Sequence, residues 1–526
     1  MKRKVAIIGL DGASLELIKT WAAAGHLPNF QKVLSQGASG KLESVFPPHS
    51  APAWSTLYTG KNLGKHGLFD FIALRQNTYD ILPTSFADNK AQTFWDLASL
   101  AGKSCVALNL PLTYPPRPLN GIFVSGLQTP AGVSDFTYPQ GLKKELDALT
   151  GGYTIYPIEF ERNREAYLES LIEVTENKFK VFSHYFQQKD WDLFMCVFQG
   201  TDLIQHYFWQ YMDPDHPYYQ PDNKYRDVIR KYYQRMDRYL AEFLDHLDKE
   251  TTLMIVSDHG FAALHKYFYI NNWLYKWGMI KFKQTPKVWA KKACFALDFM
   301  PNVGKKTRHF FSFRDIDWSK TRAFSFTNTG QIFINLKGRQ PQGAVEPGQE
   351  YEQVCDQIVR LLGEIKDPQT QERVIERAYK RSQIYSGHYT ALLPDVFYLP
   401  NQGRYVNSGG NKFYSNKLIE KCHPEDISGG HSLYGIALFY GNGIKQNSDL
   451  EGLHLQDVAP LVLAILGIDI PKDMDGRLKP QMVQADFLGK VGFQAAQEKT
   501  SAEKFAYTQT ESEEIQKRLK ELGYID

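Results

Sequence analysis

The sequence has few cysteines and no long uninterrupted hydrophobic run. Its five cysteines are odd in number and far apart, and no two of them form a CxxC pair. This usage indicates a reducing compartment. No apolar stretch reaches the roughly 18 residues that a membrane-spanning helix needs. We therefore expect a cytoplasmic protein without a transmembrane segment.

The chain also lacks an excess of charge of either sign, an internal repeat and a low-complexity region. Lysine and arginine number 61 against 58 acidic residues, a net charge of +3. Nucleic-acid binders normally show a clustered basic excess, so we expect no nucleic-acid partner. The N-terminal MKRKVAIIGLDG has no small-residue cleavage site and is typical of a strand rather than a signal peptide. The 526 residues, 43% of them hydrophobic, suffice for a large buried core.

Short apolar runs alternate with helical patterns over the first half of the chain. VAIIGL, SCVALNL, GIFVSGL, LFMCVF and TLMIVSD are typical of buried strands, and LELIKTWAAAG, TFWDLASLAG and residues 162–187 of helices. Such alternation predicts an α/β fold, a three-layer sandwich with a mostly parallel central sheet. Ligands of such folds bind at the carboxyl ends of the strands.

The alternation stops near residue 276 and returns near residue 429, where GIALFYG and DVAPLVLAILG predict another strand and helix. We therefore predict an inserted α+β cap. The expected units are 1–275, the first part of the catalytic core; 276–428, the cap; 429–495, the second part of the core; and 496–526, a tail helix.

The start of the cap mixes lysine and arginine with phenylalanine and tryptophan over residues 276–320. One interpretation is a surface that meets lipid or an anionic substrate. The simpler interpretation, which we favour, is a solvated cap helix with an apolar inner face.

Acidic residues and histidines of the kind that bind metals follow the predicted strands. Asp11 follows VAIIGL, Asp202 and His206 follow LFMCVF, Asp258 and His259 follow TLMIV, and His431 precedes GIALF. Asp202 and His206 are one helical turn apart, so both can face the same point. A single aspartate after a strand is usually a helix cap or a turn residue, and a lone histidine usually belongs to a loop. Together the six suit two divalent metals with mixed oxygen and nitrogen ligands, the preference of zinc.

A serine lies between the first two of these segments, in ESVFPPHSAPAWSTLYTG. Ser50 precedes Ala51-Pro52, and proline is favoured in the first turn of a helix. Ser50 should therefore cap a helix whose free amides and dipole favour an anion. A serine in this place is very often only a helix cap. The nearby metal-type segments favour a nucleophile, because a metal can ionise a hydroxyl bound to it.

In their order, these motifs resemble the type I phosphodiesterase/nucleotide pyrophosphatase branch of the alkaline phosphatase superfamily. GLDG, PPHSAPAW…TGKNLGKHGLFDF, TDLIQH, SDHGF, GGHS and DVAPLVLAILGIDIPKDMDGR carry the resemblance over nearly the whole chain. INLKGRQPQGAVEPGQEYE and the LGYID tail are similar to a prokaryotic group of predicted phosphohydrolases or phosphomutases.

The resemblance implies a ligand set and a mechanism. One metal would be held by Asp11, Ser50, Asp258 and His259, and a second by Asp202, His206 and His431. The two divalent ions would be zinc, with manganese as the alternative. Ser50 would attack phosphorus in line, and the resulting phospho-serine would be hydrolysed or would pass its phosphoryl group to an acceptor.

Two positions depart from related patterns. Nucleotide pyrophosphatases carry an asparagine where this chain has Ala53, so nucleotide specificity does not follow from the resemblance. Sulfatases carry an arginine where this chain has Trp54, which argues against their modified nucleophile. Charge stabilisation must then come from elsewhere. Lys65, Lys337 and Arg339 are candidate substrate-binding residues, although each alone is more often a solvated surface charge.

We therefore expect a metal-dependent phosphohydrolase that cleaves a phosphodiester or pyrophosphate bond. A diester is favoured slightly over a monoester, because a dianionic monoester needs more cationic groups around it. One alternative is a phosphomutase or head-group transferase that uses the same serine. The other is an inactive binding protein on this fold. The expected partner is a small phosphorylated substrate, with nucleotides and lipid head groups among the candidates.

Overall fold

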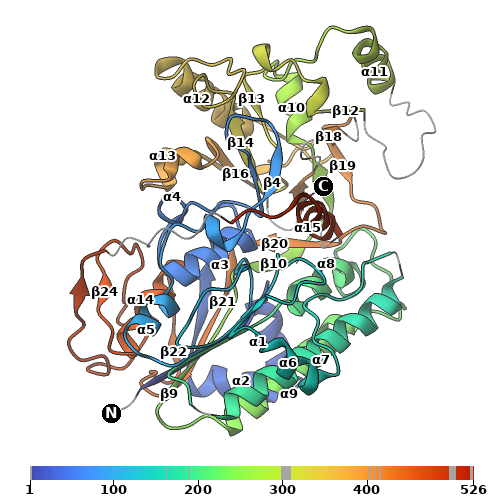
Figure 1. The fold of residues 1–526 in the computed structure, drawn as a ribbon. Helices are drawn as coiled ribbons and strands as arrows, with labels where there is room; N and C mark the ends of the chain where they lie inside the picture. The colour runs from blue at the N-terminus through green and yellow to red at the C-terminus, as the bar shows by residue number, and fades with distance from the viewer. Residues whose placement is uncertain are drawn as a thin grey trace.

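The protein consists of a lower lobe built on a large sheet and a smaller upper lobe (Figure 1). The computed structural model describes residues 3–161, 163–188, 190–297, 310–401, 404–408, 410, 412–413, 416–496, 505–521 and 525. Among these residues, no helix combines the length and the apolar character needed to cross a membrane.

The lower lobe contains a ten-stranded sheet, in the order β22-β2-β21-β9-β1-β8-β5-β6-β7, with β23 also paired to β2. The strands are β22 (Ser448–Asp449), β2 (Ala38–Glu43), β21 (Tyr434–Gly441), β9 (Thr251–Val256), β1 (Lys4–Leu10), β8 (Leu193–Phe198), β5 (Cys105–Leu110), β6 (Gly121–Ser125), β7 (Thr137–Tyr138) and β23 (Leu453–His454). The central strands β9, β1, β8, β5 and β6 are parallel. Every residue of β1, β8 and β9 is buried, because helices cover both faces of a parallel sheet.

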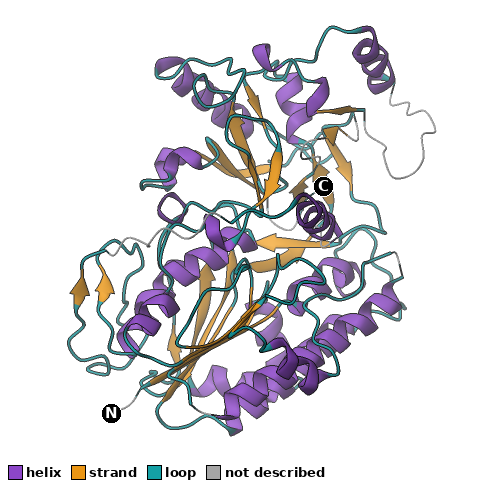
Figure 2. Ribbon diagram, in the orientation of Figure 1, coloured by secondary structure: helices purple, strands orange, loops and turns teal. Residues whose placement is uncertain are grey.

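Helices pack on both sides of this sheet, as Figure 2 shows. One side carries α1 (Leu15–Ala23), α2 (Pro28–Gln36), α6 (Lys143–Thr150), α7 (Arg164–Gln188) and α9 (Val228–Asp245). The other side carries α3 (Ser50–Thr59), α5 (Phe94–Leu100) and α14 (Val458–Ile465). The predicted three-layer α/β sandwich is therefore confirmed. Continuous apolar runs identified these strands because strands buried on both faces need apolar side chains at every position.

The upper lobe is an α+β insertion. The chain leaves the core after β10 (Gly260–Ala263) and returns at β20 (Gly429–Ser432). The lobe contains a sheet in the order β13 (Ala323–Phe324), β14 (Gln331–Ile334), β16 (Val396–Pro400) and β15 (Ile375–Lys380), with α12 (Gln349–Gly363) packed on it. A second sheet joins β17 (Tyr405–Asn407), β11 (Lys266–Phe268) and β19 (Ile419–Lys421). Because β11 pairs with two lobe strands, the lobe begins before residue 276, where the composition changes.

A hairpin from the core sequence also enters this lobe. It comprises β3 (Ile72–Leu74) and β4 (Ile81–Pro83). Tyr79 in its loop stacks on Trp318 of the insertion, with ring centroids 3.7 Å apart. The hairpin also contacts α15 (Gln509–Glu521) through a hydrogen bond from Gln516 Nε2 to the carbonyl of Ile81. Of the LGYID tail, only Ile525 lies among the described residues.

The basic and aromatic stretch at the start of the cap contains α11 (Pro286–Ala296), at the outer end of the upper lobe (Figure 1). Val288 faces inward, whereas the side chains of Trp289 and Leu297 are 62% and 78% exposed. The helix thus has an apolar inner contact and also an exposed apolar face. Residues 298–309 of this stretch lie outside the described part of the chain.

Candidate active site

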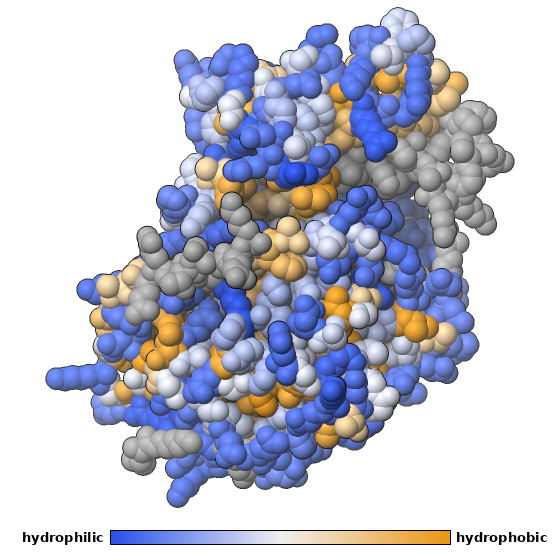
Figure 3. Space-filling view, in the orientation of Figure 1, coloured by the Kyte–Doolittle hydropathy of each residue, from blue (hydrophilic) through white to orange (hydrophobic). Residues whose placement is uncertain are grey.

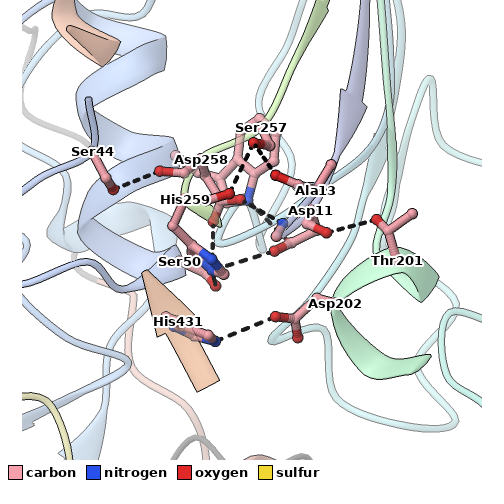
Figure 4. A network of polar contacts seen from close by, with 12 residues as sticks. Asp11, Ala13, Ser44, Ser50, Thr201, Asp202, Ser257, Asp258, His259 and His431 are labelled. Atoms are coloured by element: carbon pink, nitrogen blue, oxygen red, sulfur yellow. Dashed lines mark hydrogen bonds and ion pairs between the residues drawn. The ribbon is translucent and has the colours of Figure 1, made fainter. Parts of the chain in front are cut away.

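The metal-type residues of the sequence meet at the carboxyl edge of the central sheet (Figure 4). Strands β8, β1 and β9 are neighbours, so the segments that follow them converge. Asp11 follows β1, Asp202 lies in the first turn of α8 (Gly200–Met212) after β8, and Asp258 follows β9. His431 arrives from the far end of the insertion because β20 pairs with β10, which sets it opposite Phe261.

Asp11, Asp258 and His259 form the first of two groups with the geometry of a metal site. One possible ligand atom from each lies within 4.8 Å of the others. Nε2 of His259 is 3.6 Å from Oδ1 of Asp11 and 3.3 Å from Oδ2 of Asp258. The hydroxyl of Ser50 is 3.1 Å from the same Nε2 atom. All four residues are fully buried, so they form one compact cluster around the serine.

Asp202, His206 and His431 form the second group, again with ligand atoms within 4.8 Å. Oδ2 of Asp202 lies 3.4 Å from Nε2 of His206, and Oδ1 of Asp202 lies 3.3 Å from Nε2 of His431. The groups adjoin, because the rings of His259 and His431 stack with centroids 3.7 Å apart. The structure thus brings together all seven residues that the resemblance assigns to the metals.

Backbone carbonyls set the orientation of two of the histidines. Nδ1 of His259 is 3.0 Å from the carbonyl of Gly260, and Nδ1 of His206 is 2.9 Å from that of Gly429. A carbonyl oxygen only accepts, so Nδ1 carries the proton in both rings. In the neutral ring, Nε2 then offers its lone pair to the centre of the group. Histidine ligands of metals are commonly held in this way.

The electrostatics of the first group fit a bound cation. Burial, followed by the charge of Asp258, raises the pKa of Asp11 well above its usual value. Burial and the charge of Asp202 raise the pKa of Asp258 to about 7. Oδ1 of Asp11 and Oδ2 of Asp258 are buried, and no residue that the structure describes donates a hydrogen bond to them. Buried carboxylates of this kind usually coordinate metals or pair with cations.

Ser50 is the first residue of α3, one position after the N-cap residue His49. The sequence places it at the cap itself, a difference within the usual uncertainty of helix ends. Amides in the first turn of a helix have no partner within the helix, so they and the helix dipole favour an anion beside Ser50. The helix therefore directs both a hydroxyl and a site for negative charge toward the metal-type groups.

Three further residues shape the site without having been assigned a role from the sequence. Trp54 donates a hydrogen bond of 3.1 Å from Nε1 to Oδ2 of Asp11. It lies four residues after Ser50, so helical spacing could have placed it on the same face. Thr201 donates to the carbonyl of Asp11 at 2.6 Å. Gly12 has a φ of +62°, and a Cβ atom there would lie 3.1 Å from Oδ1 of Asp202. A side chain at Gly12 would be strained and would crowd the ligands.

A pocket of about 90 Å³ opens beside the second group, between the two lobes. His49, His206 and His431 line its inner end. The inserted lobe contributes its other wall, chiefly residues 328–330, 399–400 and 405–407. Among the described residues that line this pocket there is no lysine or arginine. The space next to the metal-type groups is therefore mainly neutral.

The three cationic candidates lie elsewhere in the structure. Nζ of Lys65 is 2.5 Å from Oδ1 of Asp475 and bonds the carbonyl of Asp473. Lys337 pairs with Glu346 on the surface. Arg339 makes a two-pronged contact with the buried carboxylate of Asp395, at 2.9 Å for Nη1 and 2.5 Å for Nη2. None of the three lines the pocket beside the metal-type groups.

A buried aspartate connects the core to the inserted wall of this pocket. Thr329 donates a hydrogen bond of 2.9 Å to Oδ2 of Asp70. Burial raises the pKa of Asp70 to about 7, although hydrogen bonds from Thr329 and the backbone oppose the shift. An unfolded aspartate has a pKa of about 4. Between these pH values the folded protein binds a proton at Asp70 that the unfolded chain does not. The free energy of unfolding therefore falls as the pH rises from about 4 to 7.

We expect Asp70→Asn to remove this pH dependence. At pH 8 the variant should have a free energy of unfolding about 2–4 kcal/mol higher than the wild type, because the buried charge is gone. At pH 4, where Asp70 is protonated in the folded protein and about half protonated in the unfolded chain, the difference should shrink to within about 0.5 kcal/mol. Chemical denaturation at both pH values measures the difference. Asp80→Asn, at an exposed position nearby, is the matched control. An equal effect of Asp70→Asn at both pH values would contradict this explanation.

The chain matches the family model of the type I phosphodiesterase/nucleotide pyrophosphatase family over residues 5–424. This range holds all the metal-type residues except His431. No curated protein matches the chain in sequence.

Two solved structures show the same fold at low sequence identity. Phosphonoacetate hydrolase from Sinorhizobium meliloti 1021, in complex with phosphonoformate, is 14% identical with a TM-score of 0.56, and the match covers 88% of this chain and 96% of that one. An inactive variant of murine ectonucleotide pyrophosphatase/phosphodiesterase 5, in complex with AMP, is 12% identical with a TM-score of 0.51. The match covers 89% of this chain and 96% of that one. The family match over most of the chain shows that this protein belongs to the type I phosphodiesterase/nucleotide pyrophosphatase family and is a phosphoric ester hydrolase.

Proposed function

We propose that the protein hydrolyses a phosphodiester or pyrophosphate bond through a covalent phospho-Ser50 intermediate. The observation that carries the proposal is the position of Ser50, whose hydroxyl adjoins the first metal-type group at the N-terminus of a helix. Two divalent cations, zinc or alternatively manganese, would stabilise the attacking and nonbridging oxygens when bound by the two groups. Nitrogen and oxygen ligands in each group suit either ion.

The protein's own residues account for the geometry of the reaction. Ser50 Oγ forms a bond to phosphorus as the bond from phosphorus to the leaving oxygen breaks, and the hydroxyl proton passes to solvent. Water then attacks the phospho-serine, breaks the bond to Oγ and restores the serine hydroxyl. The first-turn amides of α3 favour the negative charge that gathers on the phosphoryl oxygens.

The neutral pocket favours a substrate with one negative charge at phosphorus. A diester group carries a single charge, whereas a monoester carries two near neutral pH. The described lining of the pocket offers no lysine or arginine to offset a second charge. The bound AMP and phosphonoformate of the two related folds show that these frameworks accept small phosphorus-containing ligands. The pocket of this chain supports a diester with a neutral substituent.

This preference predicts a higher kcat/KM for bis-p-nitrophenyl phosphate than for p-nitrophenyl phosphate. We expect a ratio of at least about tenfold, equivalent to about 1.4 kcal/mol of transition-state stabilisation. Release of nitrophenol by the metal-loaded protein measures both substrates. A faster monoester reaction would contradict the diester preference while leaving the hydrolase assignment intact.

Transfer to an alcohol instead of water is the second candidate. It is favoured by the position of the pocket between the lobes, where the inserted wall can hold an acceptor next to the phospho-serine. An alcohol or sugar that stimulates nitrophenol release and appears in a new phosphodiester would support transfer. Release of nitrophenol at a rate independent of added acceptor supports hydrolysis.

A further inference from the structure

A second, larger cavity is lined in part by Phe333 of strand β14 and by residues 336–340 that follow this strand. It measures about 640 Å³, within the range of sites for small molecules. Its described lining shares no residue with that pocket. Thr329 of the first pocket bonds Asp70, and Phe69 of the second cavity accepts a hydrogen bond at its carbonyl from Gln331 Nε2.

Cationic side chains from four segments converge on this cavity. They are Arg75 in the hairpin of β3 and β4, Lys90 after a short 3-10 helix, Lys337 and Arg339 after β14, and Arg381 at the start of α13 (Arg381–Ile384). Asp88 is the only acidic residue among the described lining residues. Its carboxylate caps the preceding turn by accepting a hydrogen bond of 2.8 Å from the backbone of Ser85.

The neighbouring acids offset only part of this positive charge. Arg339 and Arg381 share one carboxylate, that of Asp395, and Lys337 pairs with Glu346. Within the part of the chain that the structure describes, neither Arg75 nor Lys90 forms a salt bridge. Both are exposed at the rim. The cavity therefore keeps an excess of positive charge, which favours an anionic ligand.

The floor of the cavity is apolar. It is formed by Leu68, Phe69, Leu74, Phe333, Leu336 and Leu392. The side chain of Leu392 is 48% exposed, although a leucine gains by burial. On the face drawn in Figure 3, hydrophobic residues show in a hollow between the lobes, with hydrophilic residues around it. A ligand that matches both features has an anionic head and an apolar or aromatic body.

We propose that this cavity is a second ligand site, separate from the catalytic pocket, which binds a small organic phosphate with an apolar group. The rim cations Arg75 and Lys90 contact the phosphate, and the apolar floor covers the rest of the ligand. Arg339 and Arg381, fixed by Asp395, hold the positive edge of the site in place. The apolar group is an alkyl chain, as in a lipid, or an aromatic base, as in a nucleotide.

Calorimetric titration of hexylphosphonate into the Ser50→Ala protein, after treatment with a chelator, tests the proposal. Chelation removes the cations that would hold a phosphonate at the catalytic groups, and the charge-reversal variant described next locates the binding that remains. We expect hexylphosphonate to bind at least about tenfold more tightly than inorganic phosphate, because the alkyl chain is buried. Hexanol should bind more weakly than hexylphosphonate. Titration of AMP distinguishes an aromatic base from an alkyl chain as the apolar group. If AMP binds more tightly than hexylphosphonate, the apolar group is aromatic.

The double variant R75E/K90E, made in the same Ser50→Ala protein, locates the binding. We expect at least a tenfold loss of affinity for the tighter of the two ligands, with an unchanged melting temperature because both positions are exposed. The matched control is K32E/K231E, which reverses two exposed charges on the lower lobe. Equal affinities for hexylphosphonate and phosphate, no measurable binding of any probe, or full affinity in R75E/K90E would overturn the proposal.

Discussion

Ser50→Ala should lower the turnover of bis-p-nitrophenyl phosphate by at least about 10⁴-fold, the usual effect of removing a catalytic nucleophile. The hydroxyl is buried and 3.1 Å from Nε2 of His259, beside the first metal-type group. The melting temperature should change little, because the substitution removes one oxygen atom. Nitrophenol release and thermal unfolding of both proteins measure the two effects.

Ser55→Ala is the control for this experiment. Ser55 lies in the same helix and is also buried, and its hydroxyl bonds only the carbonyl of Ala51 among the contacts that the structure describes. We expect it to keep wild-type turnover. Phosphoserine trapped by acid quench in the wild type, and absent from Ser50→Ala, would establish the covalent step. Full turnover in Ser50→Ala would rule out Ser50 as the nucleophile.

Removal of the metals should abolish turnover and lower the stability of the folded protein. Asp11, Asp202 and Asp258 are buried close together, and two bound cations neutralise their mutual repulsion. A ligand present at a thousand times its Kd stabilises a protein by about 4 kcal/mol, so each ion should raise the melting temperature measurably. Elemental analysis, turnover and thermal unfolding before and after chelation, and after addition of zinc or manganese, measure the effect.

Asp258→Asn provides a sharper form of the same prediction. Burial raises the pKa of Asp258 to about 7, so at pH 8 its carboxylate is costly in the metal-free protein. The variant should therefore melt higher than the wild type without metals, but lower than the wild type with them. Asp237→Asn, at a buried carboxylate that caps α2 and lies outside both groups, should leave the metal content unchanged. Undiminished turnover in chelated protein would contradict metal dependence.

Local sequence patterns were sufficient to predict the core of the fold. The runs at β1, β8 and β9 are apolar at every position, and only strands covered on both faces require that. The hairpin of β3 and β4 was missed because its strands have three residues each and pack against the insertion rather than the central sheet. The start of the insertion was placed too late for a similar reason, since β11 owes its position to pairing with β17 and β19.

The sequence by itself determined which residue types could carry the chemistry: the aspartates and histidines that follow strands, and a serine before a helix. Parallel strands end at one edge of a sheet, so sequence order was enough to expect Asp11, Asp202 and Asp258 together. Only the tertiary structure decided which partners the candidate lysine and arginine side chains bind. Lys65 and Arg339 bind carboxylates remote in the sequence, Lys337 binds one only nine residues away, and each pair forms within a single lobe. A long, flexible charged side chain carries no local signal of its partner, whereas a buried strand must be apolar wherever the sheet places it.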